Sequence, residues 1–107
     1  MSLDVYLEAR RMCDVHTGNV THNLLPMARE AGLAEALWYP VENGLDSAEK
    51  LIPILESGLS LLGSDPARFR QLNPENGWGD YNGLIKFVES YLSACKDNPD
   101  AVVSVSR

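Results

Sequence analysis

The stretch SLDVYLEA (residues 2–9) alternates apolar and polar side chains along its length. A period of two indicates a half-buried β-strand, because successive side chains of a strand point to opposite faces. The apolar set that we expect to face a core is Leu3, Val5 and Leu7. This strand needs partners from elsewhere in the chain, because a single strand cannot form a stable sheet.

Two further stretches alternate in the same way and are predicted to be those partners. Residues 12–17 place Cys13 and Val15 on one face and His16 on the other, and Gly18-Asn19 is expected to end the strand. The connection at 10–11 makes a hairpin with the first strand plausible, although it lacks a strong turn dipeptide. The second partner is the alternating tail at 101–106. We expect all three strands to share one small antiparallel sheet.

Between the strands, apolar residues recur at helical spacing. The strongest helical pattern covers 80–97, and a second one at 46–62 opens at Asp46 and carries Pro53, where we expect a kink. Shorter helices are predicted at 64–72, at 33–38 and from about 23 to 32, with Thr21 and Asn23 as alternative N-caps and Asn23 favoured. The prediction is one α+β domain over 1–107, with a small antiparallel sheet built from an N-terminal hairpin and a C-terminal strand and covered on one face by three to five helices.

The composition favours a soluble cytoplasmic protein. The formal net charge is -6, from 15 acidic and 9 basic residues, which disfavours a nucleic-acid partner. No apolar run reaches the length of a membrane span, and acidic residues interrupt the N-terminus where a signal peptide would be apolar. Cys13 and Cys95 are then expected to be reduced thiols.

The helix at 46–62 has a wide leucine-rich stripe with two interpretations. Burial in the core of the domain is favoured, and the alternative is a homodimer that forms through this helix. Ile54 and Leu61 lie outside the stripe, so more than one side of the helix carries apolar residues.

Two clusters of amides and aromatics are the candidate functional site. One is 19–23 (NVTHN) and the other is 73–81 (NPENGWGDY), with Trp38 as a second aromatic wall. Neutral donors and acceptors beside a stacking surface are the materials of a recognition pocket. Capping of helix ends and burial of Trp78 beneath its loop are the structural alternatives. The candidate ligand-binding residues are Asn19, Thr21, His22, Asn23, Trp38, Asn76, Trp78 and Tyr81.

Catalytic and metal sites have weaker support. His22 is the candidate general acid or base, and it would need a partner such as Asp80, Glu75 or Glu42 within hydrogen-bond reach. Cys13, His16 and His22 are suitable metal ligands by type, but their spacing does not fit a structural zinc site, so no metal is expected. The chain has no phosphate-cradling glycine loop, and no cofactor is expected.

Five segments carry a family resemblance: SLDVYL at 2–7, NVTHNL at 19–24, LWYP at 37–40, NPENGWG at 73–79 and VSVSR at 103–107. On these segments the chain resembles a family of small uncharacterised proteins encoded in bacterial and bacteriophage genomes. The resemblance covers essentially the whole chain and implies a mobile-element or phage context. The family has no established activity, so no catalytic residue follows from it. Tyr39 stands where an arginine is expected, which weakens an anion-binding role at that step.

Three functional hypotheses follow. The first is a cytoplasmic ligand-binding or protein-interaction module, whose partner is a small planar or nucleotide-like ligand or a host protein. The second is a small enzyme that uses His22 as general acid or base. The third is a structural or oligomer-forming protein that associates through the 46–62 helix. The first hypothesis requires a closed pocket between the two clusters, and the second requires a carboxylate beside His22.

Overall fold

The computed structural model describes residues 2–8 and 14–107 of the chain. The predicted hairpin connection at 10–11 and Cys13 lie outside the described residues. The described part contains three strands: β1 (Ser2–Glu8), β2 (Asp14–Thr21) and β3 (Val102–Ser106). The helices are α1 (Leu25–Glu30), α2 (Ala34–Trp38), α3 (Ala48–Ser64), α4 (Pro66–Arg70) and α5 (Tyr81–Asp97), with short 3-10 turns η1 (His22–Leu24) and η2 (Val41–Asn43).

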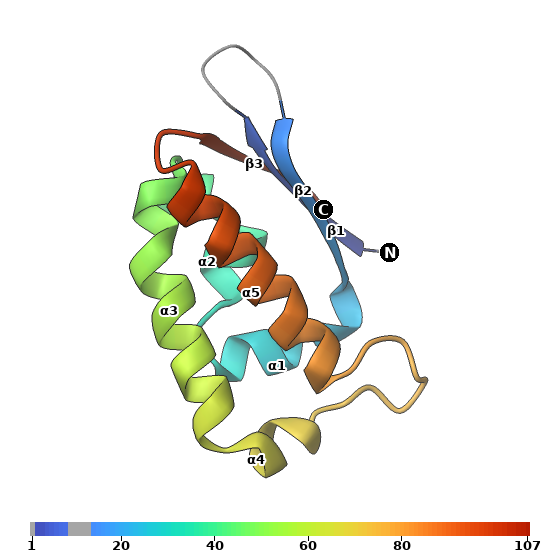
Figure 1. The fold of residues 1–107 in the computed structure, drawn as a ribbon. Helices are drawn as coiled ribbons and strands as arrows, with labels where there is room; N and C mark the ends of the chain where they lie inside the picture. The colour runs from blue at the N-terminus through green and yellow to red at the C-terminus, as the bar shows by residue number, and fades with distance from the viewer. Residues whose placement is uncertain (1, 9–13) are drawn as a thin grey trace.

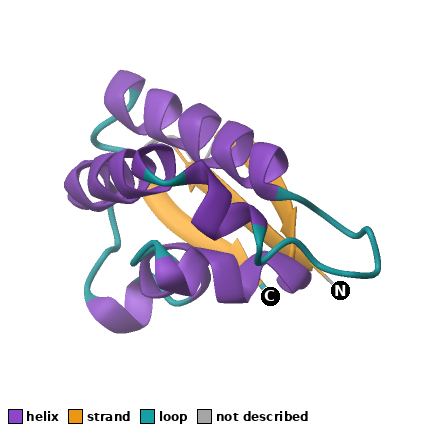
Figure 2. Ribbon diagram, turned by 90° about the horizontal axis from the view of Figure 1, so that it is seen from below, coloured by secondary structure: helices purple, strands orange, loops and turns teal. Residues whose placement is uncertain are grey.

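The three strands form one antiparallel sheet in the order β2-β1-β3. β1 therefore occupies the centre, between its neighbour in the chain and the strand from the opposite end of the chain. The helices lie on one face of this sheet and leave the other face bare (Figure 1, Figure 2). The prediction of an α+β fold with an N-terminal hairpin and a C-terminal strand is confirmed.

The core lies between the inner face of the sheet and the two long helices. Leu3, Val5 and Leu7 of β1 are fully buried, as their alternation predicted. α3 and α5 pack against each other over this face (Figure 1). The leucine-rich stripe of α3 is part of the same core, with its fully buried leucines at Leu51, Leu55 and Leu62.

Two details of β2 differ from the sequence prediction. The strand does not end at Gly18-Asn19 but continues to Thr21. Glycine at 18 allows close packing, since a Cβ there would lie 3.1 Å from Cε1 of Phe87. We expected the face opposite Cys13 and Val15 to meet solvent, but the His16 ring on that face stacks on that of buried Tyr91 at 5.7 Å. Partial burial lowers the pKa of the imidazole.

The helix starts follow local capping chemistry, with two corrections. Thr21, and not the favoured Asn23, is the N-cap of the first helical turn, and its hydroxyl accepts a hydrogen bond from the Asn23 N–H. Ser47, and not Asp46, occupies the N-cap position of α3, but its side chain makes no capping hydrogen bond, and Asp46 pairs instead with Lys50 at 2.8 Å. Asp80 caps α5 as predicted, by accepting from the Gly83 N–H.

The two edges of the sheet differ. The outer edge of β3 is partly covered by the chain before α3, because Val103 N–H donates to the Asp46 carbonyl and Ala48 N–H donates to that of Ala101. The outer edge of β2 has no such cover among the described residues. Among those residues, no helix is both long enough and apolar enough to cross a membrane.

A matched pair of glycines in α3 tests the packing of this helix. Gly58 is buried against Leu33, and a Cβ at 58 would overlap the side chain of that fully buried leucine. We expect Gly58→Ala to lower the free energy of unfolding by about 1–3 kcal/mol because the core cannot accept the extra methyl group. Gly63 has open space around it, so Gly63→Ala should raise it by about 0.5–1 kcal/mol. Urea denaturation measures both, and equal effects would contradict this packing.

Candidate functional site

The two polar-aromatic clusters meet in space at one end of the sheet. An open pocket of about 470 Å³ lies between the end of β2 and the 73–80 loop, and we call it the loop pocket. Its lining comes from both clusters and from the start of β1: Ser2, Asn19, Thr21, Asn23, Asn76 and Trp78. The loop extends from the body of the molecule beside the N-terminus (Figure 2). The pocket is open to solvent on one side and is not the closed pocket that the ligand-binding hypothesis required.

Two side-chain hydrogen bonds hold the loop, one that joins its two ends and one within it. The Asn73 carboxamide oxygen accepts from the Tyr81 N–H at 2.8 Å, and that of Asn76 accepts from the Trp78 N–H at 2.9 Å. Gly79 has φ +97° and lies against the end of β2, where a Cβ would be 2.7 Å from Cγ2 of Thr21. The close approach of Gly79 to Thr21 therefore brings the loop against the strand.

Trp78 presents most of its ring to solvent at this pocket. Its side chain is 68% exposed, so it does not plug the core beneath the loop. A tryptophan this exposed leaves a large apolar surface in contact with water. The alternative prediction, burial of Trp78 beneath its loop, is therefore wrong, while its role in stacking on a ligand stays a prediction.

The polar groups of the loop pocket retain hydrogen-bonding capacity. Asn19 Nδ2 donates to Ser2 Oγ at 2.9 Å and to Asp4 Oδ1 at 2.6 Å, which leaves the Asn19 carbonyl oxygen as an acceptor. Asn23 Nδ2 donates to Thr21 Oγ1 at 3.1 Å, which leaves a second carboxamide oxygen. The hydroxyls of Ser2 and Thr21 and the amide nitrogen of Asn76 remain as donors. The pocket thus offers donors and acceptors without charge on any described lining residue.

Three of the predicted site residues lie outside the loop pocket. Tyr81 is 6% exposed and its hydroxyl donates to the Leu62 carbonyl at 2.7 Å, so it anchors α5 to α3. Trp38 is 2% exposed, and His22 packs against it with ring centroids 6.1 Å apart. Within the described residues, Nε1 of Trp38 and Nε2 of His22 have no hydrogen-bond partner. These three aromatic side chains belong to the core or its margin.

In the described part of the chain, His22 and the potential metal-ligating side chains lie apart from the partners that the sequence predictions named for them. The acid-base hypothesis requires a carboxylate that hydrogen-bonds to His22, and no described carboxylate does so. No group of three or more potential metal-ligating side chains comes together among these residues. Cys95 is buried, and burial raises the pKa of its thiol to about 12, which leaves it protonated and unreactive at neutral pH.

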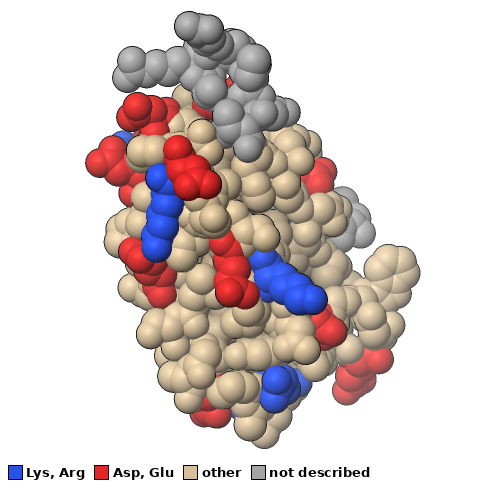
Figure 3. All heavy atoms as spheres, viewed as in Figure 1, with Lys and Arg blue, Asp and Glu red and all other residues tan. Residues whose placement is uncertain are grey.

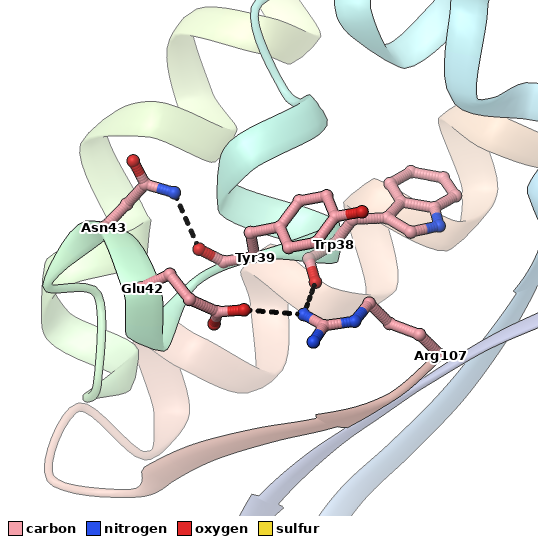
Figure 4. Close-up of polar contacts among 5 residues, drawn as sticks. All are labelled: Trp38, Tyr39, Glu42, Asn43 and Arg107. Atoms are coloured by element: carbon pink, nitrogen blue, oxygen red, sulfur yellow. Dashed lines mark hydrogen bonds and ion pairs between the residues drawn. The ribbon is translucent and has the colours of Figure 1, made fainter.

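Arg107 ties the end of β3 to the segment after α2, a contact that sequence patterns did not indicate. Its Nη1 donates to the Trp38 carbonyl at 2.8 Å and to Glu42 Oε2 at 2.9 Å (Figure 4). Its guanidinium lies 4.5 Å from the ring centre of Tyr39. A backbone hydrogen bond and the one from Arg107 lower the pKa of the Glu42 carboxyl. The Tyr39 ring therefore makes a cation–π contact with the Arg107 guanidinium.

Surface charge does not single out another site on the helical face. Acidic and basic side chains are interspersed over α3 and α5 in the view of Figure 3, with no broad basic patch on this face. Some of them pair across elements: Lys96 of α5 with Glu56 of α3 at 3.1 Å, and Arg68 of α4 with Glu30 of α1 at 2.7 Å. Such exposed pairs contribute little to stability.

Removal of the Arg107 side chain tests its contacts with the Trp38 carbonyl and Glu42. Arg107→Ala should lower the Tm at neutral pH by about 4–8 °C, because loss of the partly buried hydrogen bond to Trp38 costs about 1 kcal/mol. The lowered pKa of Glu42 means that its share of the stabilisation is present above pH 4.5 and is lost as the pH falls through the folded-state pKa. Thermal melts at about pH 7 and pH 3 should show a smaller difference in acid. A pH-independent difference would contradict the ion pair.

A second glycine pair tests how the loop docks on the strand. Gly79→Ala should displace the loop, because the new Cβ would collide with Thr21, and the amide NMR signals of Thr21 and Leu24 should shift. Gly77 also has positive φ but has open space around it, so Gly77→Ala introduces only backbone strain of about 1–2 kcal/mol. If both variants shift the strand signals equally, the contact between Gly79 and Thr21 does not position the loop.

Comparison with known proteins adds no family assignment. No protein-family model matches the chain, and neither a curated protein nor a solved structure matches it. The resemblance to small bacterial and bacteriophage proteins therefore stays a prediction from the sequence. Functional inference rests on the geometry of the loop pocket and its surroundings.

Proposed function

We propose that the protein is a ligand-binding module and that its loop pocket takes the uncharged, planar part of a nucleotide-like ligand. One observation carries this proposal: a tryptophan that is 68% exposed stands beside five side chains that bear hydroxyl or carboxamide groups. An aromatic face for stacking and mixed donors and acceptors for a polar ring edge are what a nucleobase requires.

The electrostatics of the loop pocket favour a nucleoside over a highly charged nucleotide. None of the described lining residues is Lys or Arg, and Asp4 lies directly behind Asn19. A phosphate group here would lack the cationic partners that usually bind it. We therefore place the base and the sugar in the pocket and any phosphate in solvent.

The geometry of Asn19 and Asn23 suits recognition of a base edge. Each carboxamide uses its nitrogen within the protein and keeps its oxygen for a ligand, while Asn76 keeps its nitrogen. A base edge that carries an amino group beside a ring acceptor would match these groups. Its amino group would donate to a carboxamide oxygen, and its acceptor would receive a hydrogen bond from the Asn76 nitrogen. Two specific hydrogen bonds in addition to stacking are consistent with weak to moderate affinity in an open pocket.

The biological setting is also part of the proposal. On the resemblance alone, we place the protein in a bacterial or bacteriophage cytoplasm, where capture of a small host signalling molecule is the corresponding role. A mobile element would gain from sequestering such a molecule without chemical conversion. This role needs no catalytic group, and it is compatible with the position of His22 against Trp38 and away from any hydrogen-bonding carboxylate of the described chain.

Fluorescence titration and thermal shift test this function. Stacking of a base on Trp78 should quench the exposed tryptophan and raise the Tm, because a ligand that binds only the folded state stabilises it. The panel is adenosine, guanosine, cytidine, uridine, their monophosphates and cyclic dinucleotides. We expect a responsive nucleoside to act as strongly as its monophosphate. In Trp78→Ala the affinity, measured by thermal shift, should fall by about 5- to 150-fold, since base-aromatic stacking contributes about 1–3 kcal/mol.

The control removes an exposed apolar side chain far from the loop pocket in the sequence. Leu61 of α3 is 38% exposed and does not line the pocket, so Leu61→Ala should respond like the wild type. A flat response to the whole panel at millimolar concentration would reject a nucleoside-like ligand. A response that survives in Trp78→Ala would show that the ligand binds elsewhere.

A further inference from the structure

The open edge of β2 has backbone groups that no described residue pairs. The Val103 N–H points away from β1 and donates to the Asp46 carbonyl. Because backbone groups of successive residues in a strand point to opposite sides, this bond sets which residues of each paired strand face their neighbour. Leu7 pairs with Val103 on one side and His16 on the other, and Val5 pairs with Gly18. His16 and Gly18 therefore direct their N–H and C=O groups toward β1. Thr17 and Asn19 direct theirs outward.

Hollows flank this edge on both faces of the sheet. On the bare face, a hollow of about 450 Å³ is lined by Asp4, Tyr6 and residues 17–19, and we call it the sheet-face hollow. On the helical face, a hollow of about 440 Å³ lies between residues 16–19 and α5, where Gly83, Lys86, Phe87 and Ser90 line it, and we call it the helix-side hollow. Both hollows adjoin Thr17 and Asn19.

An added β-strand needs this combination of features. Its backbone pairs with outward N–H and C=O groups, and its side chains alternate between the two faces of the sheet. The edge at Thr17 and Asn19 supplies the backbone groups, and the two hollows supply space for alternate side chains. By contrast, the β3 edge is partly taken by the chain at 46–48. Natural proteins usually protect an exposed edge, so an open edge beside two hollows is a docking surface.

We propose that a peptide segment of a partner protein binds here by strand addition to β2, with acidic side chains directed to the helix-side hollow. Lys86 is the charged residue among the described lining of that hollow, and it makes no ion pair with another described residue. The sheet-face hollow contains Asp4, so it suits apolar or hydroxyl side chains. The charge distribution thus selects a peptide that alternates acidic and apolar residues.

A second copy of the chain is the competing occupant, and charge disfavours it. Two β2 edges that pair antiparallel near Gly18 would bring the Lys86 side chains of both copies to the same region. Each copy also has a formal net charge of -6, which opposes close association. A short peptide with carboxylates toward Lys86 avoids the first obstacle, and it carries less negative charge than a second copy of the chain.

The probe is an N-acetylated, C-amidated octapeptide that alternates glutamate with valine. Titrated into the ¹⁵N-labelled protein, it should produce saturable shifts and slow the hydrogen exchange of the Thr17 and Asn19 amides. Thr17→Pro removes one outward N–H but none that faces β1, and it should weaken binding at least about tenfold, whereas Thr17→Ala should bind normally. Two versions of the peptide, N-methylated at alternate residues in opposite phases, test the ladder on the wild type without depending on folding of the proline variant. The version that loses the N–H groups facing β2 should bind at least about tenfold more weakly than the version that loses the N–H groups facing away.

A charge-matched pair tests the role of Lys86. Lys86→Glu should weaken binding of the glutamate peptide by about tenfold, while Arg29→Glu makes the same charge change on α1 and should have little effect. Absence of shifts at millimolar peptide, or equal binding by Thr17→Pro, would overturn the proposal. A concentration-dependent dimer that Thr17→Pro dissolves would overturn it in favour of a second copy.

One variant distinguishes failure of the strand-addition proposal from failure of the nucleoside proposal. Trp78→Ala should weaken nucleoside binding and leave the octapeptide affinity unchanged, because Trp78 lines neither hollow beside the β2 edge. Loss of both activities in this variant would overturn strand addition as a separate site.

Discussion

The pairing of β1 with strands from both ends of the chain is the constraint on which the rest of the structure depends. β1 is the central strand, and its three leucine and valine side chains at 3, 5 and 7 are fully buried beneath the helices. β2 continues into η1, and the tail that follows α5 returns as β3. Closing the sheet around β1 therefore fixes the place of the helical layer and sets the start of β1 beside the end of β2 and the 73–80 loop. The loop pocket exists because of this closure.

The same topology makes the two sheet edges unequal, and this inequality concentrates exposed chemistry on β2. The β3 edge is bridged by the chain before α3, and Arg107, which follows β3, is tied to Trp38 and Glu42. The β2 edge has no cover of this kind in the described chain. Asn19 lines the loop pocket and both hollows beside this edge. One short strand thus borders both the pocket that we propose for a nucleoside and the edge that we propose for a peptide.

Local patterns predicted most elements because those elements follow from side-chain spacing and capping. The alternation at 2–8 and the helical periodicity at 81–97 are properties of short windows and were interpreted correctly. The errors have nonlocal causes. Gly18 lies in β2 because it pairs with Val5 of β1. The His16 ring stacks on that of Tyr91 in α5, and the Tyr81 hydroxyl donates to the Leu62 carbonyl. No window of sequence contains those partners, so residue type alone could not separate a structural aromatic from one that meets a ligand.

The sequence by itself determined that the chain forms an α+β fold, that two clusters rich in amides and aromatics stand apart from the core pattern, and that the surface is acidic. These are consequences of composition, periodicity and turn chemistry, which act over a few residues. Only the tertiary structure decided that the clusters meet, that Trp78 is exposed while Trp38 is buried, and that Ser2 and Asn19 join the same pocket. It also decided which sheet edge is open. The physical reason is that these properties depend on strand order and on contacts between segments distant in the chain, which form only when β1 receives both of its partners.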